Sequence, residues 1–195
     1  MSKDKQNKTD PPGRAGDKDF LSSVRELRDR ARRHIEQGAV VEGYRAHRPT
    51  VLKLLNEALA TELICVLRYK RHYFMADGIN AKSVAAEFQQ HAAEEQGHAD
   101  EIAARIVQLG GEPNFSPDGI AERAHAEYKE GRNLLDMIRE DLVAERIAIE
   151  SYSEMVAYIG HDDPTTRSML EGILAMEEEH AEDLASLLAT MGKKG

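Results

Sequence analysis

Two copies of a Glu-x-x-His motif are the residues with the most specific chemistry in this chain. Glu95 precedes His98 by three positions, and Glu177 precedes His180 by three. Residues three apart on a helix share a face, so each pair can present one carboxylate and one imidazole to the same point. One such motif arises often by chance in helices rich in Glu and His. Two of them in one chain favour a metal site.

A lone glutamate precedes each motif and makes the pattern an internal repeat. Glu62 and Glu145 are each followed seven positions later by a tyrosine, Tyr69 and Tyr152. A seven-residue step returns to the same helix face. The interval from the lone glutamate to the motif glutamate is nearly equal in the two halves. The second half of the chain therefore repeats the first, one helix pair for another.

The elements that must position these residues are four long helices. Abundant Ala, Glu, Leu and Arg favour helix over sheet. Asp77-Gly78, Gly110-Gly111 and Gly160 are stop signals, and Asp163-Pro164 is a start signal. The short link after the first helix requires an antiparallel hairpin. We predict helices over residues 50–76, 81–109, 132–159 and 164–191, with a crossover over 110–130 that contains a small helix over 116–128.

This order of elements predicts an all-α, antiparallel four-helix bundle with a long crossover between its second and third helices. One glutamate would come from each of two helices and a Glu-x-x-His from each of the other two, which is the ligand set of dinuclear carboxylate bundles. Two divalent cations would match four buried glutamates in charge and make their burial tolerable. Oxygen ligands with two imidazoles suit Fe or Mn better than Cu(I), and Zn is a possible substitute.

Each proposed ligand has an expected role. We expect Glu62 and His98 to be terminal ligands of one metal, and Glu145 and His180 of the other. Glu95 and Glu177 would then bridge the two ions, with Tyr69 and Tyr152 as hydrogen-bond partners of the ligands or as core residues. Other residues have outer roles: we expect Cys65 to be a buried hydrophobe, His91, Glu94, Glu178 and Glu179 to lie on the solvated face or behind the ligands, and His34, His47, His72, His125 and His161 to lie on the surface.

The residues before the bundle form two predicted segments. Residues 1–18 mix charges with prolines and glycines and are predicted to be a disordered tail. Residues 19–48 are predicted to be a helix over 19–37 and a linker, because Phe20, Val24, Leu27, Ala31 and Ile35 recur at helical spacing. That apolar stripe needs a partner surface, on its own bundle or on a neighbouring subunit. The bundle domain is predicted over 49–191 and a short tail over 192–195.

Composition limits the class of protein. The 195 residues suit one domain, and the net charge is −9. Residues 1–48 are mildly basic, so the bundle itself is strongly acidic and suited to attracting cations. The single cysteine indicates a reducing compartment. Because neither a secretory signal nor a membrane-length apolar run is present, we expect a cytoplasmic protein without membrane partners.

At the six ligand positions and Tyr69 the chain resembles the ferritin-like superfamily, specifically bacterioferritins and Dps-like proteins with a bacterioferritin-type site. The resemblance covers about residues 49–191. It implies a ferroxidase with a dinuclear iron centre, which oxidises Fe²⁺ with O₂ or H₂O₂. It also implies that a hollow homo-oligomeric shell stores the ferric mineral.

Three departures from the family's patterns refine these expectations. Bacterioferritins place a haem-ligating Met where this chain has Gln96, so we expect no haem. Thioferritins carry a cysteine pair beside the site, and the matching positions here are Ile147 and Arg167. Few residues follow His180, so the fifth helix that lines the fourfold channels of 24-subunit cages is not expected. A shell of 12 subunits is therefore favoured over one of 24.

Two alternative functions remain open. The same bundle supports a peroxidase or a dimanganese catalase, although a rubredoxin-like Cys-x-x-Cys unit is absent. The other alternative is a Dps-type protein that protects DNA. Basic residues of the tail could contact phosphates, but interleaved aspartates weaken that hypothesis; the basic residues are Lys3, Lys5, Lys8, Arg14 and Lys18.

Overall fold

The structure is a computed structural model that describes residues 22–79 and 81–192. This part of the chain is helical and contains no strand. The helices are α1 (Val24–Ala31), the 3₁₀ helix η1 (Ile35–Gln37), α2 (Arg48–Met75), α3 (Ala81–Gln108), α4 (Ile120–Arg123), α5 (Leu134–Ile159) and α6 (Pro164–Gly192). No helix in these two ranges is both long and apolar enough to cross a membrane.

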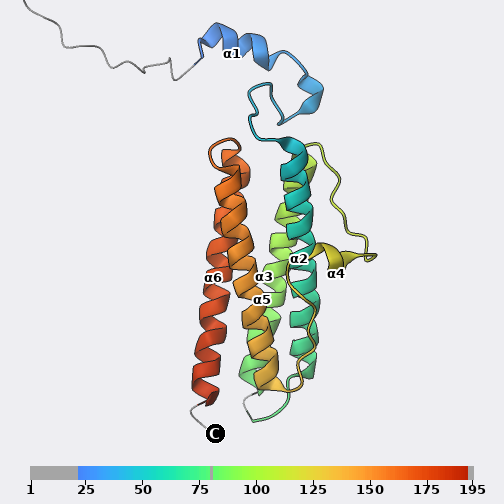
Figure 1. The fold of residues 1–195 in the computed structure, drawn as a ribbon, viewed down its shortest axis with the longest axis vertical. Coiled ribbons are helices and arrows are strands. Elements are labelled where there is room, and N and C mark those ends of the chain that lie inside the picture. Colours follow the sequence, from blue (N-terminus) through green and yellow to red (C-terminus); the bar gives the residue numbers. More distant parts are fainter. Residues whose placement is uncertain (1–21, 80, 193–195) are drawn as a thin grey trace, which may run out of the picture.

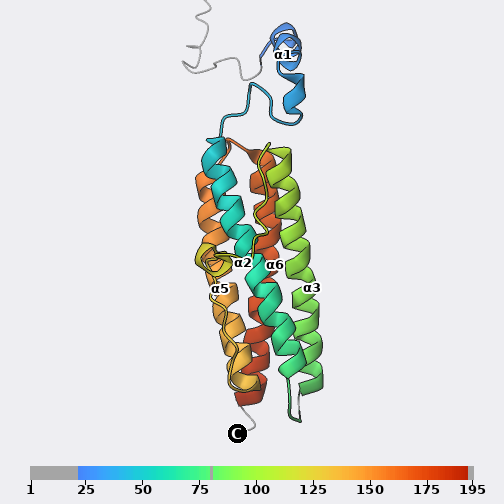
Figure 2. The ribbon, with the colours of Figure 1, turned by 90° about the vertical axis from the view of Figure 1, so that its right-hand side faces the viewer.

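The four long helices form an antiparallel bundle. The helices α2 and α3 make one hairpin and α5 and α6 make the other, and the two hairpins lie side by side (Figures 1 and 2). The crossover runs the length of the bundle, so that α5 starts at the end where α2 finishes (Figure 1). The all-α four-helix prediction is confirmed, and each long helix begins and ends within a few residues of its predicted bounds.

Local signals explain where the second hairpin begins and turns. The Asn133 side chain caps α5 by accepting a hydrogen bond from the backbone N–H of Asp136 at 3.0 Å. Gly160 ends α5 with a φ of 54°, a conformation that favours glycine. Asp163 caps α6 by accepting from the backbone N–H of Thr166 at 3.0 Å, and Pro164 occupies the first helical position.

The hydrophobic core has two parts, one in each half of the bundle. The first part packs the start of α2 against the end of α3 and the turn between α5 and α6. The second packs the end of α2 against the start of α3 and both outer ends of the other hairpin. Between them lies a layer of buried carboxylates and imidazoles. Representative members of the two parts are Leu55, Leu59, Ile102, Ile106 and Leu170 in the first and Cys65, Tyr69, Phe88, Ile138 and Leu184 in the second.

The crossover contains less helix than predicted. We expected a small helix over 116–128, but α4 covers only Ile120–Arg123. Beyond it the backbone is extended and bonds to side chains of α2. The N–H of His125 donates to Thr61 Oγ1 at 2.9 Å, and Arg68 Nη1 donates to the carbonyl of Glu127 at 2.8 Å. These tertiary hydrogen bonds replace the local ones that a longer helix would need.

A buried charged network holds this crossover to the bundle. His72 is fully buried and lies 2.7 Å from Asp141 through Nδ1, while its Nε2 lies 3.1 Å from the carbonyls of Lys129 and Glu130. Arg68 pairs with the other oxygen of Asp141 at 3.0 Å. The prediction that His72 lies on the surface is therefore wrong, because the returning crossover covers this part of α2.

The N-terminal helix is also shorter than predicted. The helix α1 ends at Ala31, and His34 has a φ of 52°, which interrupts the expected run to Gln37. Val24 is 61% exposed and Leu27 is 48% exposed, so the bundle of the same chain does not cover the apolar stripe. An unpacked helix of this length gains little stability, which explains its early end. The predicted tail over 1–18, with Phe20, and the last three residues lie outside the described ranges.

Candidate metal centre

The polar layer at the middle of the bundle brings together the six residues predicted as ligands. One glutamate comes from α2 and one from α5, and each Glu-x-x-His comes from α3 or α6. All four carboxylates are at most 1% exposed, in the middle of a hydrophobic core. Burial of unpaired carboxylates costs several kcal/mol each, so this layer needs compensating positive charge. The six residues are Glu62, Glu95, His98, Glu145, Glu177 and His180.

These residues form two overlapping groups of potential ligand atoms. One group contains Glu62, Glu95, His98 and Glu177, and the other contains Glu145 and His180 with the same two glutamates, Glu95 and Glu177. Within each group the ligand atoms lie within 4.8 Å of one another. Glu95 and Glu177 belong to both groups, which is the position that a bridging carboxylate must occupy.

Both imidazoles direct Nδ1 at the shared glutamates. His98 Nδ1 lies 3.0 Å from Glu177 Oε1 and 3.4 Å from Glu95 Oε2. His180 Nδ1 lies 3.4 Å from Glu177 Oε2 and 3.5 Å from Glu95 Oε1. The two oxygens of each bridging residue thus face different imidazoles. The layer has the symmetry that the internal repeat predicts.

The ligand atoms fit divalent cations because most of them are buried without a hydrogen-bond partner. Buried polar groups in proteins are almost always satisfied, so a concentration of exceptions needs an explanation. Cations at the two positions would coordinate these atoms and match the four carboxylates in charge. The unpartnered atoms are Glu62 Oε2, Glu95 Oε1, Glu145 Oε2, both Oε atoms of Glu177, His98 Nδ1 and His180 Nδ1.

The buried carboxylates and imidazoles of this layer shift one another's pKa values. Burial, together with the negative charge of Glu177, raises the pKa of Glu95 and of Glu145 well above the ordinary value. Burial alone would lower the pKa of His98, but the nearby carboxylates of Glu177, Glu62 and Glu95 raise it to about 12. Similarly, Glu177 and its neighbours raise the pKa of His180 to about 9 against the effect of burial. Metal binding must therefore displace protons.

The two tyrosines of the repeat cross between the hairpins. The Tyr69 hydroxyl, on α2, donates to Glu145 Oε1 on α5. The Tyr152 hydroxyl, on α5, donates to Glu62 Oε1 on α2. Each tyrosine is 1% exposed, so these hydrogen bonds are fully buried. They leave the second oxygen of each lone glutamate free to face the centre.

Two residues behind the ligands have closer contacts than their sequence positions alone indicated. Glu94 Oε2 accepts from His180 Nε2 at 2.9 Å, which fixes the ring with Nδ1 toward the centre. His91 is 1% exposed, and its Nδ1 lies 3.1 Å from the Tyr69 hydroxyl. Burial, together with the positive charge of His180, lowers the pKa of His91 to about 4. The spacing of His91, four residues before Glu95 on the same helix face, was the sequence signal that could have placed its side chain near the ligands. In contrast, Glu178 and Glu179 are exposed.

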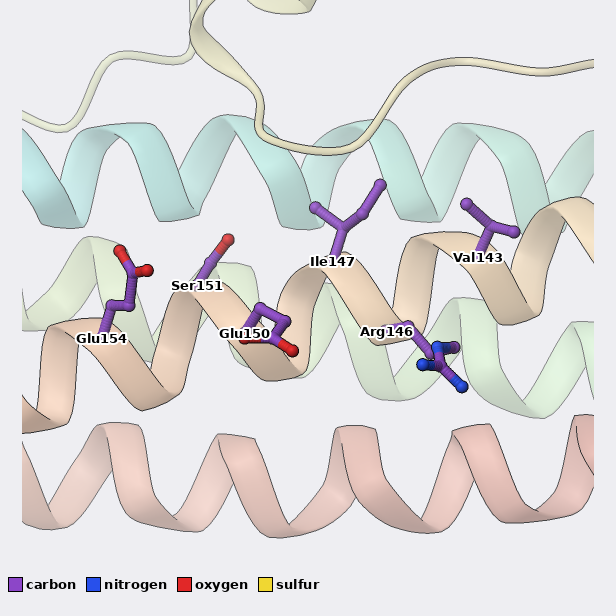
Figure 3. A pocket seen from close by; sticks show the side chains of 6 residues that line it. All are labelled: Val143, Arg146, Ile147, Glu150, Ser151 and Glu154. Carbon is purple, nitrogen blue, oxygen red and sulfur yellow. The ribbon is translucent and has the colours of Figure 1, made fainter.

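Cys65, Ile147 and Arg167 belong to none of the potential ligand groups among the described residues. Cys65 is buried, as predicted, and burial raises the pKa of its thiol well above the ordinary value. Ile147 lines a shallow concavity on the outer face of α5 (Figure 3), which contains none of the six ligand residues. Arg167 forms an ion pair with Glu171 at 2.7 Å on α6.

The fold and this layer together define a four-helix bundle with a buried carboxylate and histidine centre. A family model described as the ferritin-like domain matches residues 52–193. Bacterioferritin BfrA of Mycobacterium tuberculosis is 32% identical over 148 residues, which cover 75% of this chain and 89% of the relative. The chain belongs to the ferritin-like family.

Two further similarities place the chain within this family. The bacterioferritin-related dodecameric thioferritin of Bacteroides fragilis is 30% identical with a TM-score of 0.74, covering 77% of this chain and 90% of its own. A nutrient stress-induced DNA-binding protein of Synechococcus is 31% identical over 138 residues, or 69% of this chain and 78% of the relative. The resemblance to bacterioferritins and Dps-like proteins is therefore confirmed.

Proposed function

We propose that this protein oxidises Fe²⁺ to Fe³⁺ at a dinuclear centre and stores the ferric product in a homo-oligomeric shell. The observation that carries the proposal is the pair of overlapping ligand groups that share Glu95 and Glu177. Unpartnered buried oxygens and imidazole nitrogens face the middle of both groups. Bacterioferritin relatives at 32% identity support the same chemistry.

The proposed roles of the six residues follow from the two groups. Glu62 and His98 are the terminal ligands of one ion, because they occur in one group only. Glu145 and His180 are the terminal ligands of the other ion. Glu95 and Glu177 bridge the two. Carboxylates with imidazoles suit Fe²⁺, and Mn²⁺ or Zn²⁺ can occupy the same ligands.

Bound Fe²⁺ supplies the electrons, and the residues of the chain supply its position and charge balance. Two Fe²⁺ ions give one electron each, which suffices to reduce H₂O₂ with two protons to water, or O₂ with two protons to H₂O₂. The crossed tyrosines hold Glu145 and Glu62 in place, and Glu94 holds His180. Because these contacts are preformed, little reorganisation is needed when the ions bind.

A hollow shell of 12 subunits is part of the proposal. The Bacteroides fragilis protein is described as dodecameric, and the similarity covers 77% of the present chain. Closed symmetry is the general expectation for a homo-oligomer of this kind. Sedimentation velocity on the purified full chain tests this part separately, because a 24-subunit shell would have about twice the mass.

Titration of the metal-free protein with Fe²⁺ tests the function. We expect ultraviolet absorbance to break near two irons per chain when O₂ or H₂O₂ is present, followed by continued oxidation into a soluble ferric core. Without oxidant, the ions should bind and remain ferrous. A Glu177→Ala variant should lose the break, while Glu178→Ala, its exposed neighbour, should keep it. No break in the wild type would exclude the proposed centre.

The same titration separates the alternatives. Rapid disproportionation of H₂O₂ by the Mn-loaded protein, without retained iron, would indicate a dimanganese catalase. Peroxide consumption without a ferric core would indicate a peroxidase.

The DNA-protecting alternative needs a separate test, which the name of the Synechococcus relative motivates. A salt-sensitive gel shift that disappears on deletion of residues 1–18 would establish the DNA-protecting alternative. We propose that the protein is located in the cytoplasm.

A further inference from the structure

A second cluster of potential ligands lies beside the six-residue centre. Glu87 and His91 on α3 and Asp183 on α6 place one ligand atom each within 4.8 Å of one another. The cluster spans the boundary between core and solvent, because His91 is buried, Glu87 is half-buried and Asp183 is exposed. Two carboxylates of like charge therefore meet at a buried imidazole.

The hydrogen bonds of His91 determine which of its nitrogens faces this cluster as an acceptor. The Tyr69 hydroxyl donates its proton to Glu145, so its oxygen accepts from His91 Nδ1. In a neutral imidazole with Nδ1 protonated, the lone pair is on Nε2. His91 Nε2 lies 3.4 Å from Glu87 Oε1. A nitrogen lone pair and a carboxylate oxygen repel each other unless a proton or a cation lies between them, and burial together with the charge of Asp183 raises the pKa of Glu87, so a cation would replace a proton here.

His91 also connects this cluster to the buried centre. Together with Glu145 and His180 it forms another group of potential ligand atoms within 4.8 Å. The rings of His91 and His180 are stacked with their centroids 4.0 Å apart. Only the His91 ring would thus separate an ion held by the cluster from the terminal ligands Glu145 and His180.

The cluster exists in only one half of the internal repeat. Ile173 lies four residues before Glu177, where His91 lies four before Glu95. Met169 likewise occupies the position that corresponds to Glu87. Glu101, three residues after His98, is the counterpart of Asp183 and is exposed. The ligands of the dinuclear centre obey the repeat and this cluster does not, so the repeat itself does not explain the cluster.

We propose that Glu87, His91 Nε2 and Asp183 form a third divalent cation site, which receives Fe²⁺ from solvent before the ion moves to Glu145 and His180. The ligand set of two carboxylates and one imidazole suits Fe²⁺, Mn²⁺, Co²⁺ or Zn²⁺. Because Asp183 is exposed, water completes the coordination of the ion. The binding site stands on the cluster alone, and its role in delivering iron rests on the proposed function.

Anaerobic calorimetric titration of the metal-free full chain with Mn²⁺ tests the site, because Mn²⁺ is not oxidised under these conditions. We expect three ions per chain in the wild type and two in the double variant Glu87→Gln/Asp183→Asn. The matched control is Glu101→Gln, which removes a carboxylate from the equivalent position in the other half and should keep three. Circular dichroism of each variant establishes that the bundle is folded.

The outcomes separate this site from the dinuclear centre. Two ions in both the wild type and the double variant would overturn the third site and leave the dinuclear centre intact. Loss of all ions in the double variant would also overturn it, since the cluster would then be part of the centre. No binding in the wild type would exclude the proposed function together with the third site.

A rate measurement tests the role in delivery. When Fe²⁺ is limiting, the double variant should oxidise it about tenfold more slowly, in line with the usual effect of residues behind a metal ligand. The number of ions oxidised in the first turnover should stay at two, because the dinuclear ligands are unchanged. Equal rates in the double variant and in Glu101→Gln would exclude the delivery role.

Discussion

Tyr69 on α2 donates its buried hydrogen bond to Glu145 on α5 and not to Glu62 on its own helix. Tyr152 makes the reciprocal bond from α5 to Glu62. Each hairpin thus supplies the tyrosine that orients the lone glutamate of the other hairpin. The proposed metal centre and the interface between the hairpins therefore share residues, so a change at the interface should affect metal binding.

The crossed tyrosines should matter for both stability and metal affinity. Tyr69→Phe leaves a buried glutamate oxygen without its donor, which should cost about 1–3 kcal/mol in the free energy of unfolding of the metal-free protein. Loss of orientation at Glu145 should also weaken metal binding about 10–100-fold. Urea unfolding and Mn²⁺ titration measure the two effects. Tyr73→Phe, a half-buried neighbour, is the control and should change neither.

The bridging and terminal carboxylates should differ in how many ions they hold. Glu177 belongs to both ligand groups, so Glu177→Ala should abolish binding of both ions of the dinuclear centre. Glu62 belongs to one group only, so Glu62→Ala should lose only one ion of the dinuclear centre and keep the other, at Glu145 and His180. Calorimetry with Mn²⁺ counts the ions, and the same stoichiometry in the two variants would contradict the assignment of bridging and terminal roles.

Metal binding should stabilise the bundle because the folded chain alone brings the ligands together. At a free-ion concentration about 100 times the dissociation constant, one ion adds about 2.7 kcal/mol to the free energy of unfolding. For a chain of this size that corresponds to an increase in Tm of about 5–10 °C. Thermal unfolding with Mn²⁺ and with a chelator measures it. Glu95→Ala should respond far less to the ion.

The attachment of the crossover to the bundle should depend on Asp141, the buried aspartate that both Arg68 and His72 contact. Asp141→Ala leaves the Arg68 guanidinium buried without its counter-charge, which should cost about 3–5 kcal/mol in the free energy of unfolding. The control is Arg167→Ala, which breaks a partly exposed ion pair and should cost about 1 kcal/mol or less. Proteolysis of the 109–133 crossover should also accelerate in Asp141→Ala alone.

Asp163 should make stability depend on pH at acidic values. Burial raises its pKa, but hydrogen bonds from Thr166 and Tyr44, with the charge of Arg105, lower it below the ordinary value of 3.8. An aspartate with a lowered pKa in the fold stabilises it fully above the ordinary value, and this stabilisation is lost as the pH falls through the folded-state pKa.

Urea unfolding between pH 6 and pH 3 tests this expectation. Asp163→Asn should be less stable by about 2 kcal/mol at pH 6, because Arg105 loses its charged partner, and the difference should shrink as the pH falls below about 4. Asp162→Asn, an exposed neighbour, should follow the wild type at every pH. A difference that stays constant down to pH 3 would contradict a lowered pKa of Asp163.

Much of the fold follows from local patterns in the sequence. The bounds of the four long helices depend on periodicity, Asn133, Gly160 and Pro164, which act within a few residues. The exceptions are α1 and α4. Both are shorter than predicted, because no described part of the bundle covers the apolar stripe of α1 and the residues after α4 bond to α2. Periodicity alone shows neither effect.

The sequence by itself determined which residues can share a helix face, and so it determined the six proposed ligands and their division between two halves. Only the tertiary structure decided that Tyr69 faces Glu145, that His91 turns toward Glu87 and Asp183, and that His72 is buried against Asp141. The contacts Tyr69–Glu145, His91–Asp183 and His72–Asp141 each join two helices that are distant in sequence. Spacing along one helix fixes the direction of a side chain but not the neighbour that it meets, because that neighbour depends on how the two hairpins and the crossover pack.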